Sequence, residues 1–168
     1  MDIKKELLKE HSKKQTTRVV KYIGKDPMRF NELIRLFLEG PYQLAQRAGW
    51  PLSYCVEAHP DLIKPHLKAI LKMLDRKDVH DAVKRNIMRL LQYIEIPKRL
   101  HASVINHGFA LMDPKEPIAV RVFAMTVLAN IAREEPDLKK ELQIVIEDQL
   151  PYASAGYLAR ARKVLKGF

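Results

Sequence analysis

Two amphipathic segments decide the fold of this chain: PDLIKPHLKAILKML at residues 60–74 and AVKRNIMRLLQYI at residues 82–94. In the first, apolar positions recur every three or four residues, and Lys64, Lys68 and Lys72 fall on the opposite side. That spacing is typical of a helix with one buried face. The second segment repeats the pattern with Val83, Ile87, Leu90, Leu91 and Ile94. Together they predict two helices joined by the polar turn DRKD.

Prolines divide the rest of the chain into similar pairs. Pro27, Pro60, Pro97 and Pro136 each precede an amphipathic run. Proline suits the first helical turn, because the amide hydrogen that it lacks would have no partner there. We expect first helices near 27–39, 60–74, 97–113 and 136–150, and second helices near 41–58, 78–95, 116–134 and 153–166. Residues 2–23 add one or two helices, broken around 12–16, and no stretch alternates with the period of a strand.

The second helices superpose at a constant offset of 37 residues. Small residues occupy one column of that register: Ala45, Ala82, Ala119 and Gly156. Stacked helices need small side chains where their backbones approach closely. A unit of this size cannot bury its apolar face alone, so its repetition predicts a solenoid of stacked helix pairs.

Two stretches resemble the HEAT repeat, a member of the armadillo-type families. The first is AQRAGWPLSYCVEAHPDLIKPHLKAILKML at residues 45–74, and the second is AVRVFAMTVLANIA at residues 119–132. The resemblance covers roughly residues 27–168. It implies an all-α fold, a right-handed α-α superhelix of about four helix pairs with an N-terminal capping helix. We therefore expect one repeat domain over 1–168, with 1–26 as the cap and 27–168 as the repeats.

The charge of the chain is concentrated at its ends. The net charge is +10, yet residues 31–150 hold seventeen basic and sixteen acidic residues. A protein that wraps a polyanion along its length would spread its charge. The longest largely apolar stretch, residues 122–132, is shorter than the roughly 20 residues of a membrane span. With one cysteine and no secretory signal at the N-terminus, the expected location is the cytoplasm, away from membranes.

One polar column follows the register of the second helices: Arg47, Lys84 and Arg121. It would form a cationic ladder able to bind phosphates or an acidic peptide. HEAT repeats resemble one another in placing a basic residue here, often paired with an acid of the preceding turn, so a structural role is favoured. Asp78 is in place for Lys84, whereas Arg47 and Arg121 lack such an acid. At the C-terminus, Arg160 and Arg162 belong to a basic helix that is either a binding surface or a solvated cap.

Trp50 is the single tryptophan. It shares a column with Ile87, Ala124 and Ala161, which favours core packing over stacking on a ligand. Gly49 and Pro51 flank it, which predicts a bend that opens a groove.

The residues of catalytic chemistry do not form a recognisable motif. Cys55 and His59 are spaced as a nucleophile and base would be, but Cys55 lies in an apolar run, so a buried inert thiol is favoured. No metal spacing, phosphate loop or nucleophile motif is present. We expect no enzyme activity and no cofactor or metal.

The function that the resemblance implies is a non-enzymatic scaffold that binds a protein or an acidic peptide. The alternative is a nucleic-acid-binding protein, similar in architecture to DNA glycosylases built from HEAT-like repeats. Those enzymes use several aromatic residues and a catalytic carboxylate. One Trp and a nearly neutral middle argue against glycosylase activity here. The expected binding residues are Arg47, Trp50, Lys84, Arg121, Arg160 and Arg162.

Overall fold

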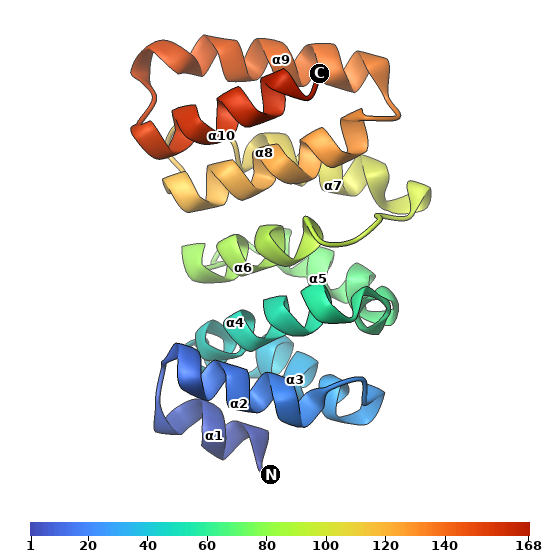
Figure 1. Cartoon of the computed structure of the whole chain (residues 1–168), viewed down its shortest axis with the longest axis vertical. Helices are drawn as coiled ribbons and strands as arrows, with labels where there is room; N and C mark the ends of the chain where they lie inside the picture. Colours follow the sequence, from blue (N-terminus) through green and yellow to red (C-terminus); the bar gives the residue numbers. More distant parts are fainter. The chain divides into compact units, whose positions relative to one another are not determined.

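The structure is a computed structural model that describes all residues from 1 to 168. It contains ten α-helices, two short 3₁₀ helices and no strand (Figure 1), which confirms the all-α class. The chain divides into two compact units, residues 1–94 and residues 95–168. The handedness of the expected superhelix stays a prediction.

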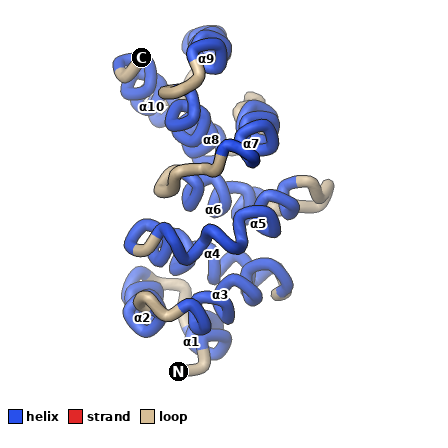
Figure 2. Tube along the Cα trace, turned by 90° about the vertical axis from the view of Figure 1, so that its right-hand side faces the viewer, coloured by secondary structure: helices blue, strands red, loops and turns tan.

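The first unit is built around α4. Its elements are α1 (Ile3–Lys9), α2 (Lys13–Ile23), α3 (Pro27–Glu39), α4 (Tyr42–Ala58), η1 (Pro60–His66), α5 (Leu67–Leu74) and α6 (Asp81–Leu91). Helix α4 packs against α2 on one side and α6 on the other, while α3 and η1 pack behind it (Figure 1 and Figure 2). Helices α2, α4 and α6 thus form one layer, which we call the second-helix layer.

The second unit is built around α8. Its elements are α7 (Lys98–Ala110), α8 (Ile118–Ala132), α9 (Pro136–Gln149), η2 (Leu150–Tyr152) and α10 (Ala155–Lys166). Helix α8 packs against α7, α9 and α10. Because it has neighbours on three sides, α8 buries apolar residues around most of its circumference, among them Val120, Ala124, Val127 and Leu128.

Side-chain caps set several helix boundaries. The Ser12 hydroxyl accepts a hydrogen bond from the amide of Gln15, and Asp26 accepts from the amides of Met28 and Arg29. Such caps satisfy amides that have no partner within the helix. Ser12 therefore explains why residues 2–23 form two helices: α1 ends at Lys9, and the next helix starts after this cap.

The predicted helix pairs are confirmed, with local corrections. Residues 60–74 form a 3₁₀ segment up to His66 followed by the short α5, where one α-helix was expected. Pro65 lies inside the 3₁₀ segment, and a proline there cannot donate the α-helical hydrogen bond. The helix expected over 78–95 starts only at Asp81, where the His80 ring accepts from the amide of Ala82.

Helices α4 and α6 approach each other closely at Gly49. A Cβ atom placed on this glycine would lie 2.1 Å from Nδ2 of Asn86, whose side chain is buried. Only glycine leaves room for that amide. Helix α4 continues unbroken through Pro51. The bend and groove expected there stay a prediction.

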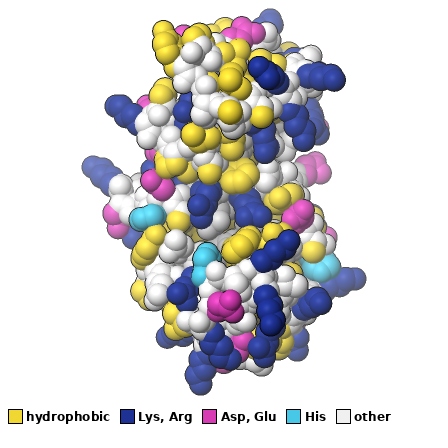
Figure 3. Space-filling model, turned by 60° about the vertical axis from the view of Figure 1, so that its left-hand side comes forward, with side chains coloured by type: hydrophobic (Ala, Val, Ile, Leu, Met, Phe, Trp, Pro, Cys, Tyr) yellow, Lys and Arg dark blue, Asp and Glu magenta, His cyan; other side chains and the backbone are white.

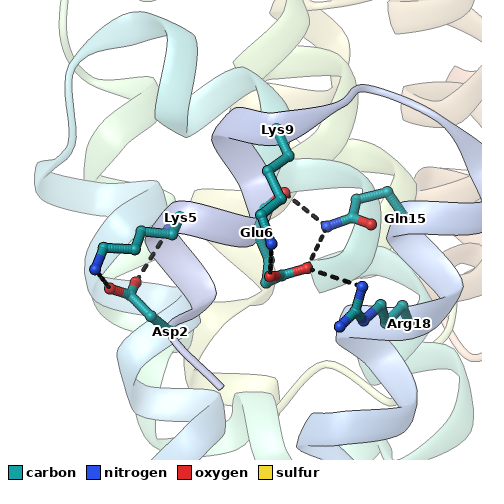
Figure 4. Close-up of polar contacts among 6 residues, drawn as sticks. All are labelled: Asp2, Lys5, Glu6, Lys9, Gln15 and Arg18. Atoms are coloured by element: carbon teal, nitrogen blue, oxygen red, sulfur yellow. Dashed lines mark hydrogen bonds and ion pairs between the residues drawn. The ribbon is translucent and has the colours of Figure 1, made fainter.

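A buried carboxylate joins α1 to α2 (Figure 4). Glu6 accepts hydrogen bonds from Lys9 and from Nε2 of Gln15, the latter at 2.7 Å, and Nη1 of Arg18 lies 3.5 Å from its Oε2. The hydrogen bond from Lys9 is the main cause of a lowered Glu6 pKa, with further help from Gln15. The N-terminal helices are therefore tied together by polar contacts as well as by apolar burial.

Candidate functional site

Helix α2 turns a row of basic side chains away from the core. Its buried residues are Gln15, Thr16, Val19 and Ile23. At 100° per residue, the positions opposite these are 13, 14, 17, 18 and 21. They are all exposed, and they line a shallow hollow that is wide open to solvent: Lys13, Lys14, Thr17, Arg18 and Lys21. Arg18 pairs with Glu6, whereas the three lysines form no ion pair.

A line of aromatic and cationic side chains crosses the adjacent helix. The Trp50 ring lies 5.5 Å from the ring of His11 and 6.4 Å from that of Tyr54, between centroids. The guanidinium of Arg89, on α6, lies 5.3 Å from the Tyr54 ring. Trp50 and Tyr54 are both half-buried. This line reaches from the loop before α2, across α4, to α6.

Helix α6 adds further cations on the outward side of the same layer. Arg85 is exposed, and Lys84 and Arg89 are half-buried, while the buried residues of α6 point to the other side. We call the cationic surface of the second-helix layer the basic face: Lys13, Lys14, Lys21, Lys84, Arg85 and Arg89. In Figure 3, Lys and Arg side chains are spread over the face in view, several of them over the lower part, at the height of α1 and α2.

Arg47 has an intramolecular role. Its Nη1 donates to the backbone carbonyls of Leu7 at 3.0 Å and Leu8 at 2.8 Å. These carbonyls lie at the C-terminal end of α1, where they have no partner within the helix. Arg47 was expected to lack an acid of the preceding turn; backbone carbonyls about 40 residues away in the sequence accept its hydrogen bonds instead.

Lys84 has an acidic neighbour, but a different one from that expected. Its Nζ lies 3.5 Å from Oδ1 of Asp81, one turn earlier in the same helix. Asp78 pairs instead with Arg76, at 3.1 Å. Asp81, in the first turn of α6, therefore takes the place expected of Asp78.

The expected binding residues of the second unit are mostly engaged in packing. Arg121 donates to Oε1 of Gln149 at 2.6 Å, and its guanidinium lies 4.5 Å from the centre of the buried Tyr157 ring. Arg121, expected to lack an acid of the preceding turn, thus contacts an amide and an aromatic ring. Arg160 donates to the hydroxyl of Thr126 at 2.6 Å, whereas Arg162 is exposed. These contacts join α8 to two of its three neighbours, α9 and α10.

Cys55 is a buried residue of α4, in the apolar core, and is 1% exposed. Burial raises the pKa of its thiol to about 12. At neutral pH the thiol stays protonated, and a thiol is a poor nucleophile compared with a thiolate. No three His, Cys, Asp or Glu side chains gather where they could hold one metal ion. No helix has both the length and the hydropathy needed to cross a membrane.

The basic residues of α2 were not among the residues expected to form a binding site. Charge counted along whole segments conceals which side of a helix carries it. The signal was present in the spacing, since positions 13, 14, 17, 18 and 21 share one side of a helix. Trp50 contacts His11, in the loop just before α2, and Lys84 belongs to the same basic face.

These features define an α-helical repeat protein, in which helix pairs stack through apolar faces. A family model described as a HEAT repeat domain matches residues 3–168, and the chain belongs to this family. The match begins before residue 27, where the resemblance was expected to start. Comparisons with curated proteins and with solved structures give no significant match.

Proposed function

We propose that this chain is a non-enzymatic scaffold that binds a protein or peptide partner on its basic face. The observation that carries the proposal is the row of three exposed, unpaired lysines on α2 beside an open hollow. Charged side chains that neither pair nor pack are available to a partner. Membership of the HEAT repeat family, whose members commonly hold other proteins, supports the same function.

A reducing location such as the cytoplasm fits this proposal. The one cysteine is a buried free thiol, so the fold does not depend on a disulfide. The same thiol offers no reactive group, which supports a scaffold rather than an enzyme.

Affinity purification with charge-reversed variants tests the scaffold function. The α2 variant, Lys14→Glu/Lys21→Glu, removes two cations of the basic face. The α5 control, Lys68→Glu/Lys72→Glu, changes two exposed lysines outside the second-helix layer. Both lower the net charge from +10 to +6, and both place one change in a first turn and one in a last turn.

We expect the wild type and the α5 control to recover the same protein from an extract of the source cells, and the α2 variant to lose it. Recovery of that protein by all three would show that the basic face is not the binding surface. If no protein is enriched with any of them, the scaffold function itself is contradicted.

Nucleic-acid binding is a second candidate, favoured by the same cations. Non-specific binding of this kind is strongest at low salt. Titration of a labelled duplex and a labelled single strand at low and moderate salt tests it, and absence of binding at low salt would dismiss it.

A further inference from the structure

We infer that the partner of the basic face is an extended acidic peptide segment that crosses α2, α4 and α6. This inference rests on the proposed function and deepens it, because it names the chemistry and direction of the bound segment. Helix α4 lies between the two cationic helices and packs against both. A segment that reaches both groups of cations therefore has to run across the layer, over Trp50 and Tyr54.

The dimensions of the layer fit a short segment. Packed helices lie about 8–10 Å apart, so α2 and α6 are separated by roughly 16–20 Å. An extended peptide advances about 3.3 Å per residue. About six residues therefore span the basic face, with acidic side chains near each end.

The cations suit carboxylates. Lys13, Lys14 and Lys21 are exposed and unpaired on α2, and Arg85 is exposed and unpaired on α6. An attraction between exposed opposite charges is weak for one pair but adds over several. Electrostatic complementarity would then supply both the choice of partner and fast association.

The aromatic side chains argue for a peptide over a nucleic acid. Single strands bind by stacking bases on accessible ring faces. Here Trp50 already has His11 and Tyr54 as neighbours, and Tyr54 has Arg89 over its ring. Each of these contacts takes up part of the ring surface on which a base would stack. An extended peptide needs only to lie across the assembled line.

The carboxylates of the same layer support the same choice. Asp81 lies at the start of α6, and its side chain is 54% exposed. A phosphate backbone carries a charge at every nucleotide and would meet this carboxylate. A peptide can place a neutral or basic residue there.

Fluorescence anisotropy with a labelled peptide of about eight glutamates tests the inference, since this length exceeds the expected span. Titrations compare the wild type, the α2 variant and the α5 control at about 20 mM and about 150 mM salt. The comparison ligands are a glutamine peptide of equal length and an oligothymidine of matching length.

We expect the glutamate peptide to bind the wild type and the α5 control alike, to bind the α2 variant at least about tenfold more weakly, and to weaken as salt rises. The glutamine peptide should not bind. If the two variants lose the same affinity for the glutamate peptide, the effect comes from net charge alone, and the basic face is not the binding site.

Two further outcomes contradict the peptide chemistry without contradicting the scaffold function. Tighter binding of the oligothymidine would assign the basic face to nucleic acid. Absence of glutamate-peptide binding at low salt, together with a protein partner that the α2 variant loses, would mean that the face binds a partner of another chemistry.

Discussion

Burial decides the chemistry of individual residues in this chain more than sequence spacing does. Cys55 and His59 are spaced as a reactive pair, yet the thiol lies in the core, and its pKa is raised to about 12. Glu6 is also buried, but the hydrogen bonds that it accepts from Lys9 and Gln15 lower its pKa instead. Cys55 is therefore unreactive near neutral pH, whereas we expect Glu6 to stabilise the fold in a way that depends on pH.

We predict that Cys55 resists alkylation in the folded protein. A shift of the thiol pKa from 9.0 to about 12 lowers the thiolate fraction near neutral pH by about a thousandfold. Iodoacetamide labelling followed by mass spectrometry, in buffer and in denaturing urea, measures the two rates. Similar rates in the two solvents would contradict the buried, protonated thiol.

Replacing Glu6 should make stability less dependent on acid pH. Its native pKa is lowered, so its contribution is present above the ordinary value of 4.5 and is lost as the pH falls through the native value. Glu6→Gln should therefore lower the urea midpoint at neutral pH, and its difference from the wild type should shrink below about pH 4.

Asp61→Asn is the control for Glu6. Asp61 pairs with Lys64 on the surface, with its side chain 87% exposed, and exposed pairs contribute little. An equal fall in the midpoint for the two variants at neutral pH would mean that the contacts of Glu6 are no more stabilising than a surface pair.

At the scale of elements, the sequence predicts helices well and their partners poorly. Prolines and apolar spacing place α3 and α9 almost to the residue, because both signals are local. The bonds from Arg47 to Leu7 and Leu8 join segments about 40 residues apart, and no local pattern contains them. Pro65 is a local signal for the 3₁₀ segment that could have been used, since proline removes an α-helical hydrogen bond.

Packing between α4 and α6 should depend on Gly49. The Cβ atom of Gly49→Ala would overlap the Asn86 side chain, and overpacking of this kind costs about 1–3 kcal/mol. The better helix propensity of alanine returns up to about 1 kcal/mol. We expect a net loss of about 1–2 kcal/mol in the free energy of unfolding, measured with urea.

Gly156→Ala is the matched control, because its new Cβ atom would meet only Ile118, at an ordinary 3.7 Å. It should leave stability unchanged or raise it slightly. A stable Gly49→Ala variant would contradict the close contact between α4 and α6.

Arg47 should contribute to stability more than to binding. Arg47→Met removes two hydrogen bonds to carbonyls at the end of α1, and we expect a loss of about 1–3 kcal/mol by urea unfolding. Arg85→Met, at an exposed position with no ion pair, should change stability by less than about 0.5 kcal/mol.

The affinity for the glutamate peptide separates the two roles of Arg47. If Arg47→Met leaves the free energy of unfolding unchanged but abolishes peptide binding, the arginine belongs to the binding surface. The bonds to the carbonyls would then contribute nothing measurable to the fold.

At the scale of the whole molecule, the distribution of charge matters more than its sum. The chain has a net charge of +10, and residues 31–150 look nearly neutral when counted along the sequence. Folding places Lys84, Arg85 and Arg89 on α6, in the same layer as the α2 lysines, and Lys84 keeps Asp81 as an acidic neighbour. Segment counts therefore predicted a neutral body, whereas the second-helix layer of residues 1–94 has a cationic side.

Because exposed charges are screened over about 8–10 Å at physiological salt, binding to this face should fall as salt increases. Trp50 lies in the middle of the face and is the single tryptophan, so its fluorescence reports on this surface alone. Acrylamide quenching of Trp50 with and without saturating unlabelled glutamate peptide is the most direct measurement. Bound peptide that crosses α4 is predicted to protect Trp50 and lower the quenching constant, and unchanged quenching at saturation would show that the peptide binds elsewhere.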